Sequence, residues 1–101
     1  MKIFIYILFG LNIIIFSQDL EDLSFGSDNS LDIATWNIEW FPKNGQATVN
    51  YVTQILQQLD LDILAMQELD NKNMFDQMID DLSVYTGYYE SAWFAGLAYI
   101  Y

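Results

Sequence analysis

Three polar side chains follow the apolar parts of two predicted strands, and their chemical types suit a metal ion. Asn37 and Glu39 end the first of these segments, and Glu68 ends the second. Asn37 and Glu39 are two residues apart, so a regular strand would point both to one face. Carboxylates with an amide suit a hard cation such as Mg²⁺, which binds through one or two carboxylates and the substrate phosphate. Ordinary caps and solvated loop residues are the alternative reading of these positions.

The segments around these residues predict a β-α-β unit. Residues 31–38, LDIATWNI, are typical of a strand. Apolar residues at helical spacing predict a helix over residues 49–59, and residues 62–67, DILAMQ, form the short apolar run of a buried parallel strand. The loops that follow two parallel strands open at the same edge of the sheet. We therefore expect the three polar side chains to converge there.

The remaining chain predicts a second helix and two further strands in an α/β fold. The helix is expected over residues 74–82, with Asp70, Asn71 and Asn73 forming the loop before it and supplying its caps. Strands are expected over residues 85–90 and 96–101. The last segment, GLAYIY, is apolar to its final residue, whereas natural chain ends usually fray in polar residues. We therefore expect an incomplete domain.

Composition excludes several classes of function. The 101 residues contain 14 Asp and Glu, three Lys and no Arg, His or Cys, for a net charge of -11. The chain therefore carries no disulfide scaffold, no Cys or His zinc site, no Cys nucleophile and no His-based triad. Three lysines cannot form the basic patch with which many proteins neutralise nucleic-acid phosphates. An apolar fraction of 53% argues against a disordered chain.

Residues 1–17 predict a signal peptide. One Lys precedes an uncharged run over residues 3–16, which is shorter than the about 20 apolar residues that a membrane-spanning helix needs. Ser17 supplies the small residue before a cut, and residues 18–30 predict an acidic linker. We expect a secreted or periplasmic protein with no stable membrane partner after cleavage. An uncleaved membrane anchor is the alternative.

Two linked motifs resemble the endonuclease/exonuclease/phosphatase superfamily, which has the DNase I-like fold. Residues 34–42 read ATWNIEWFP, and residues 61–71 read LDILAMQELDN after the predicted helix. Similar family members carry a strand ending in Trp-Asn, then a helix, then a strand with Asp-Ile, three apolar residues and Gln-Glu. The likeness spans residues 31–101. The matching residues are Trp36, Asn37, Asp62, Ile63, Gln67 and Glu68.

The resemblance implies a four-layer α/β sandwich, with residues 31–101 as its N-terminal part, and cleavage of phosphate esters with Mg²⁺ or Mn²⁺. By resemblance, Glu68 is the principal metal ligand and Glu39 assists metal binding. Asn37 would contact the scissile phosphate or orient the catalytic groups, and Gln67 would support the site. The family completes its site with a His, its partner Asp and an Asp-x-Asn segment. This sequence has no His, so we predict no hydrolase activity from these residues alone.

We interpret the sequence as the N-terminal fragment of an exported, Mg²⁺-dependent phosphoesterase. A nuclease that hydrolyses phosphodiester bonds is the leading interpretation, which makes nucleic acid and a divalent metal the expected partners. A sugar phosphate or a phospholipid head group stays open as substrate. The alternative from another class is a small acidic interaction domain, secreted or membrane-anchored, without catalysis.

Overall fold

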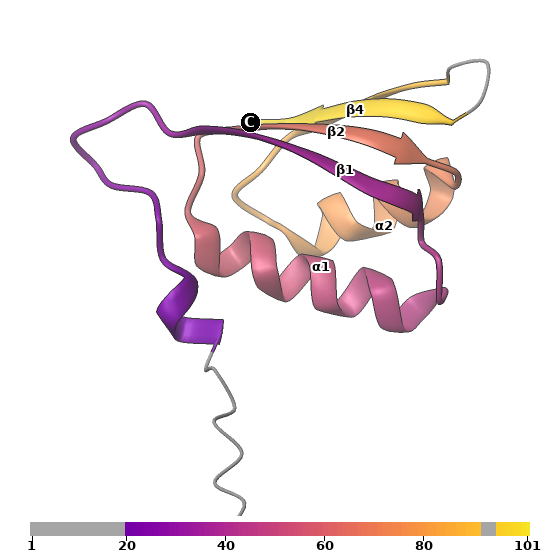
Figure 1. Ribbon diagram of the computed structural model, residues 1–101, viewed down its shortest axis with the longest axis horizontal. Helices are drawn as coiled ribbons and strands as arrows, with labels where there is room; N and C mark the ends of the chain where they lie inside the picture. The colour runs from indigo at the N-terminus through magenta and orange to yellow at the C-terminus, as the bar shows by residue number, and fades with distance from the viewer. Residues whose placement is uncertain (1–19, 92–94) are drawn as a thin grey trace, which may run out of the picture.

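The computed structural model describes residues 20–91 and 95–101. A four-stranded sheet carries two helices on one of its faces (Figure 1), and its strand order is β1-β2-β4-β3. The elements are a short 3-10 turn at Leu20–Leu23, β1 at Ile33–Phe41, α1 at Gln46–Leu59, β2 at Ile63–Leu69, α2 at Lys72–Asp81, β3 at Gly87–Glu90 and β4 at Gly96–Ile100.

The predicted β-α-β unit is confirmed. Strands β1 and β2 run parallel, in register from Ile33 opposite Ile63 to Asn37 opposite Gln67, with α1 as the connection between them. Strand β4 pairs antiparallel with β2, and β3 pairs antiparallel with the outer edge of β4. The second helix and both later strands also form where the sequence predicts them. Strand β1, however, continues to Phe41, three residues beyond its predicted end at Ile38.

Both helices cover the same face of the sheet, and the hydrophobic core lies between them and the strands. The apolar stripes of the two helices and the side chains on the facing side of the strands supply most of this core. Burying one such side chain stabilises the fold by roughly 1.5–3 kcal/mol. The buried apolar residues are Phe41, Val49, Val52, Leu56, Leu61, Leu64, Met66, Leu69, Phe75, Met78, Leu82, Ala98 and Ile100.

The other face of the sheet, which we call the open face, is exposed. It carries large apolar side chains between polar ones, among them Ile33, Leu97 and Tyr99. The ring of Tyr99 stacks on Tyr88 with 5.0 Å between ring centroids, and on Tyr101 with 5.9 Å. Aromatic and β-branched residues favour this position because they pack well across neighbouring strands.

The segment predicted as a linker, residues 18–30, is attached to α1 within its described part. The backbone N–H groups of Phe25 and Gly26 donate to the last carbonyl of α1, that of Leu59, at 3.3 and 2.9 Å. A side chain at Gly26 would overlap the carbonyl oxygen of Asp60, so only glycine allows this approach. The predicted signal peptide, residues 1–17, lies outside the described residues. None of the described helices is long and apolar enough to span a membrane.

Helix α2 begins with a side-chain cap, as the sequence predicts. The Asn71 side-chain oxygen accepts a hydrogen bond from the backbone N–H of Met74 at 3.1 Å. This bond satisfies one of the N–H groups that the first turn of a helix leaves free. Of the other candidate caps, Asp70 precedes the N-cap residue, and Asn73 lies inside α2 and is exposed.

We expect Asn71→Ala to lower the free energy of unfolding by about 1 kcal/mol, because it removes the cap. Asn73→Ala is the matched control, and we expect its effect to stay within about 0.5 kcal/mol because an exposed helical position is involved. Chemical denaturation of the full-length variants measures both. Equal effects of the two substitutions would show that the cap is not a distinct source of stability.

Candidate functional site

The structure brings Asn37 and Glu68 together at the carboxyl end of the parallel pair. The side-chain amide nitrogen of Asn37, Nδ2, donates to Glu68 Oε1 at 2.8 Å. Asn37 comes from β1 and Glu68 from β2, so the contact joins two segments that are 31 residues apart in the sequence. The expected convergence of these two side chains is therefore observed.

An extra residue in β2 makes this contact possible. From Gln67 to Leu69, β2 advances by two residues while its partner β4 advances by one, so Glu68 forms a β-bulge. The buried residues Met66 and Leu69 are three apart, whereas regular strands bury every second residue. In a regular strand Glu68 would face the helices together with Met66. The bulge instead places its carboxylate beside Asn37.

Strand β1 is irregular at the same end of the sheet. Between Asn37 and Phe41 it advances by four residues while β2 advances by two. Glu39 and Trp40 both have left-handed backbone conformations, with φ of 49° and 60°, and so does Glu68, with φ of 64°. Such a conformation costs roughly 1–2 kcal/mol for a residue other than glycine. Strained backbone of this kind concentrates at functional sites.

The orientation of the Asn37 side chain follows from its two hydrogen bonds. The backbone N–H of Glu39 donates to Asn37 Oδ1 at 3.1 Å. A backbone N–H can only donate, so the atom that faces it must be the amide oxygen, and the NH₂ group must face Glu68. One hydrogen of that group reaches Glu68. Asn37 is thus held between the backbone of Glu39 and the carboxylate of Glu68.

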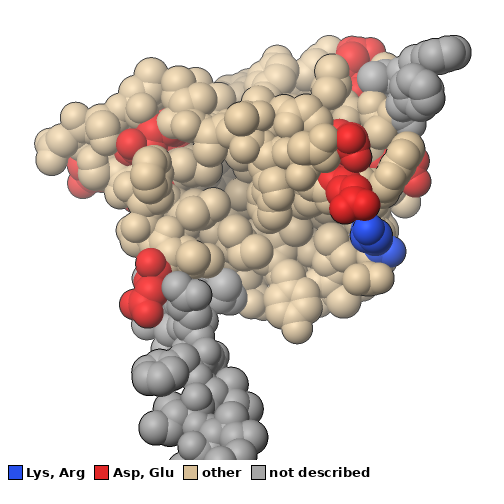
Figure 2. All heavy atoms as spheres, viewed as in Figure 1, with Lys and Arg blue, Asp and Glu red and all other residues tan. Residues whose placement is uncertain are grey.

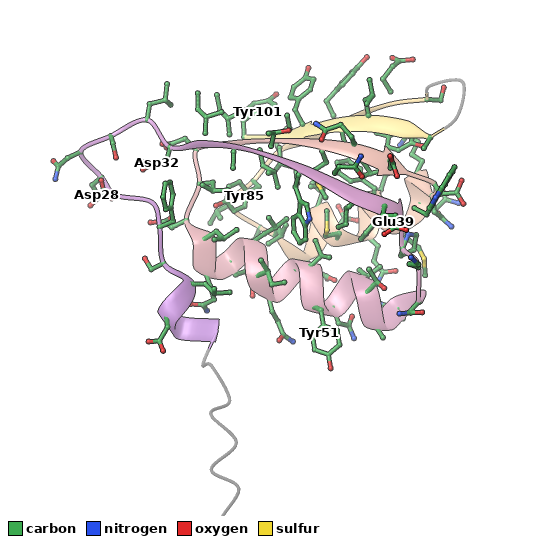
Figure 3. All side chains as sticks on the ribbon, viewed as in Figure 1. Asp28, Asp32, Glu39, Tyr51, Tyr85 and Tyr101 are labelled. Atoms are coloured by element: carbon green, nitrogen blue, oxygen red, sulfur yellow. The ribbon has the colours of Figure 1, made fainter. Side chains whose placement is uncertain are left out.

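The carboxylate of Glu39 is turned elsewhere. Its Oε1 atom lies 3.0 Å from Lys43 Nζ, and both side chains are well exposed. Figure 3 shows Glu39 at the end of β1. The expectation that Asn37 and Glu39 share a face assumes a regular strand. The backbone at Glu39 is left-handed, so this assumption does not hold. An exposed pair of this kind stabilises by at most about 1 kcal/mol, so the carboxylate can exchange its partner readily.

Gln67 braces the two parallel strands beside the site. Its Nε2 atom donates to Thr35 Oγ1 of β1 at 2.9 Å and lies 3.4 Å from the carbonyl oxygen of Ala65. The supporting role that the family resemblance implies for Gln67 stays a prediction. Thr35 is not singled out by any sequence motif, and only its alternation with Asn37 along β1 places it on the same face.

A family comparison adds to this geometry. Residues 34–101 match the model of the Endonuclease/Exonuclease/phosphatase family. The chain belongs to this family. Its members form a hydrolase superfamily, and the four-stranded sheet with its initial β-α-β unit is consistent with part of the DNase I-like fold. Comparisons with curated proteins and with solved structures gave no match.

Members of the Endonuclease/Exonuclease/phosphatase family are commonly metal-dependent, and the site supplies one carboxylate, that of Glu68, toward such an ion. Glu68 is partly buried and offers a carboxylate whose orientation Asn37 fixes. Residues 20–91 and 95–101 contain no group of three or more acidic, His or Cys side chains that could surround an ion. Mg²⁺ does not need such a cage, because it usually keeps several waters and binds one or two carboxylates together with substrate phosphate.

The charge around the site is mostly negative. In the part of the chain that the structure describes, Lys43 pairs with Glu39 and Lys72 pairs with Asp76. Figure 2 shows a small blue patch beside acidic atoms on a face that is otherwise uncharged or acidic. Both described lysines are therefore already paired with carboxylates.

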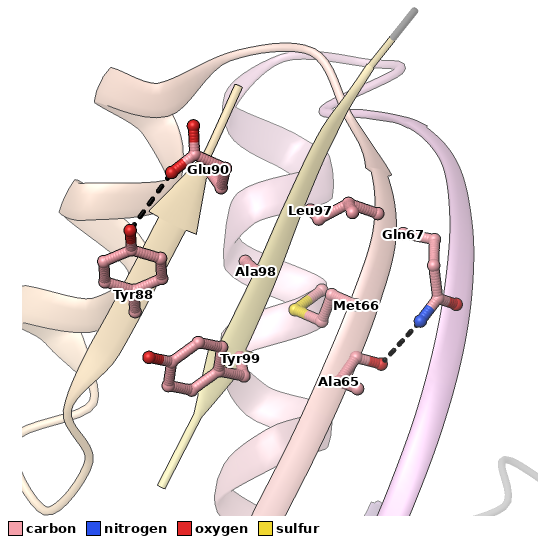
Figure 4. A pocket seen from close by; sticks show the side chains of 8 residues that line it. All are labelled: Ala65, Met66, Gln67, Tyr88, Glu90, Leu97, Ala98 and Tyr99. Carbon is pink, nitrogen blue, oxygen red and sulfur yellow. Dashed lines mark hydrogen bonds between the residues drawn. The ribbon is translucent and has the colours of Figure 1, made fainter. Parts of the chain in front are cut away.

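A shallow hollow of about 330 Å³ lies on the open face, next to the site but separate from it. Its lining includes Gln67, Tyr88 and Glu90 but neither Asn37 nor Glu68 (Figure 4). The Tyr88 hydroxyl donates to Glu90 Oε2 at 3.1 Å. This hydrogen bond, together with the negative charge of Glu90, raises the pKa of Tyr88 above its ordinary value.

Proposed function

We propose that this chain provides the metal-binding part of an active site that hydrolyses phosphodiester bonds with Mg²⁺ or Mn²⁺. The observation that carries the proposal is the hydrogen bond of 2.8 Å between Asn37 and Glu68 at the carboxyl edge of the parallel strands. Ligand sites of open α/β sheets lie at this edge. Membership of a hydrolase family supports the same conclusion.

Each residue of the site has a defined part in the proposed reaction. Glu68 holds the ion, and a bound divalent cation polarises a phosphoryl oxygen and stabilises the charge of the leaving oxygen. Asn37 donates its second N–H to a non-bridging phosphate oxygen, while the Glu39 backbone N–H keeps the amide in that orientation. Glu39 can add its carboxylate when Lys43 releases it. These residues bind and orient the phosphate, and the 101 residues include no His to transfer a proton.

Nucleic acid is the substrate that we favour. Trp40 follows Glu39 directly, and its side chain is 47% exposed beside the proposed phosphate site. Every nucleobase has a flat face that can stack on an aromatic ring, so an exposed indole suits a polynucleotide better than a simple sugar phosphate. The bound metal would compensate for the scarcity of free basic side chains.

We also propose that the protein is exported, on the basis of the uncharged run in residues 3–16. The expected mature chain begins at Gln18 or close to it. Mass spectrometry of the N-terminal peptide of the natively expressed protein, together with cell fractionation, tests this. Retention of residues 1–17 in a membrane fraction would favour the uncleaved anchor instead.

The metal assignment is tested by Glu68→Gln in the complete enzyme, since these residues alone are expected to show no hydrolase activity. This change keeps the shape of the side chain and removes its charge, so we expect metal-dependent turnover of DNA or RNA to fall by about 10³-fold. The free energy of unfolding should change by less than about 1 kcal/mol, because the substitution is nearly isosteric. Turnover of the wild type should vanish with EDTA and return with Mg²⁺ or Mn²⁺.

Glu90→Gln is the matched control for this experiment. Glu90 is an exposed carboxylate on the same sheet, in β3, and is hydrogen-bonded to Tyr88 instead of Asn37. Its substitution should leave turnover unchanged. If Glu68→Gln behaves like this control, the metal assignment is wrong and the acidic interaction domain becomes the better hypothesis.

The nucleic-acid proposal is tested by Trp40→Ala. Loss of one stacked base weakens binding by about 1–3 kcal/mol, so we expect the KM for a polynucleotide to rise about tenfold or more. Trp40→Phe should restore most of the affinity. Tyr51→Ala is the control, because Tyr51 is 66% exposed on the side of α1 that faces away from the sheet (Figure 3). A KM for Trp40→Ala equal to that of Tyr51→Ala would exclude stacking on Trp40.

A further inference from the structure

A tyrosine of the edge strand β3 contacts the backbone next to Glu68. The hydroxyl of Tyr89 donates to the carbonyl oxygen of Leu69 at 3.2 Å. Leu69 follows Glu68 directly and ends the bulge of β2. Tyr89 belongs to β3, and β4 lies between β3 and β2 in the sheet, so this side chain reaches across a whole strand.

The residue that Tyr89 crosses is a glycine. Gly96 is the first residue of β4 and pairs with Leu69 at the bulge. A Cβ atom at position 96 would lie 2.3 Å from the ring of Tyr89, far inside van der Waals contact. The absence of a side chain at Gly96 therefore gives the ring its path to Leu69.

Contacts on both sides hold the backbone of the β2 bulge in place. The ring of Tyr89 packs against the buried ring of Phe75 in α2, with 5.8 Å between the centroids, which fixes its position. On the opposite side, the backbone N–H of Asp70 donates to the carbonyl of Phe41 in β1 at 2.8 Å. Residues 69 and 70 are thus tied to both neighbouring parts of the sheet. A left-handed residue such as Glu68 persists only where the surrounding structure fixes it in this way.

We infer that Tyr89 is a positioning residue, which keeps the Glu68 carboxylate next to Asn37 by holding the carbonyl of Leu69. Its role in metal binding rests on the proposed function, whereas its role in the geometry of Asn37 and Glu68 does not. Groups that orient a metal ligand without touching the metal typically change metal affinity by about 10–100-fold when they are removed.

Tyr89→Phe tests this inference in the full-length protein. The variant keeps the ring and its contact with Phe75, and loses only the hydroxyl that holds Leu69. We expect Mn²⁺, titrated alone and followed by electron paramagnetic resonance, to bind about tenfold more weakly. We also expect the NMR signal of the Asn37 side-chain NH₂ group to shift, because that group reports its contact with Glu68. Gly96→Ala should move both readouts in the same direction by displacing the ring.

Tyr88→Phe is the matched control. Tyr88 lies on the same strand as Tyr89, and the variant also loses one hydroxyl hydrogen bond, the one to Glu90 at 3.1 Å. The side chain of Tyr88, however, lines the open face. We expect it to leave both Mn²⁺ affinity and the Asn37 signal unchanged. If Tyr89→Phe lowers stability but matches Tyr88→Phe in both readouts, Tyr89 has only a structural role and the inference is wrong.

The two proposals fail in different ways. Suppose that the wild type binds Mn²⁺ and that Glu68→Gln weakens this binding but Tyr89→Phe does not. The inference is then wrong, and the proposed function stands. If the wild type binds no Mn²⁺, or Glu68→Gln has no effect, the proposed metal site fails. The Asn37 signal then decides alone: a shift in Tyr89→Phe supports the positioning role, and an unchanged signal excludes it.

Discussion

The parallel pairing of β1 with β2 is the constraint on which the other features depend. It sets two chain segments side by side so that both end at one edge of the sheet, and it requires α1 as a crossover on one face. Because α2 lies on that same face, the core forms on one side of the sheet and the other side stays exposed. The position of Asn37 beside Glu68 follows from this arrangement together with the bulges.

The bulges allow the same strands to contribute side chains both to the hydrophobic core and to the candidate site. Phe41 and Leu69 are both fully buried, and each lies three residues after the preceding core-facing position of its strand. The extra residue in β2 releases Glu68 from the alternation that would turn it toward the core together with Met66. Its carboxylate therefore reaches the end of the sheet beside Asn37 without leaving a charge in the apolar core, where an unpaired charge would be strongly destabilising.

The sequence predicts the fold better than the site. Apolar periodicity suffices to place both helices and all four strands, because burial on one face imposes that periodicity. The approach of Asn37 to Glu68 is also predictable, since two parallel strands end together. The direction of the Glu39 carboxylate is not, because it depends on left-handed backbone at Glu39 and Trp40. The spacing of Met66 and Leu69 does carry a signal for a bulge, but a strand end explains that spacing equally well. The roles of Thr35 and Tyr89 depend on contacts between strands that no motif records.

The position of Glu68 affects both the stability of the sheet and the geometry of the candidate site. Without residue 68, Met66 and the following leucine would alternate regularly and β2 would pair with β4 without interruption. The backbone would then lose a left-handed residue that costs roughly 1–2 kcal/mol. The same left-handed residue places the carboxylate of Glu68 beside Asn37. Under the proposed function, the strained backbone at Glu68 exchanges stability for activity, as trade-offs of this kind commonly do.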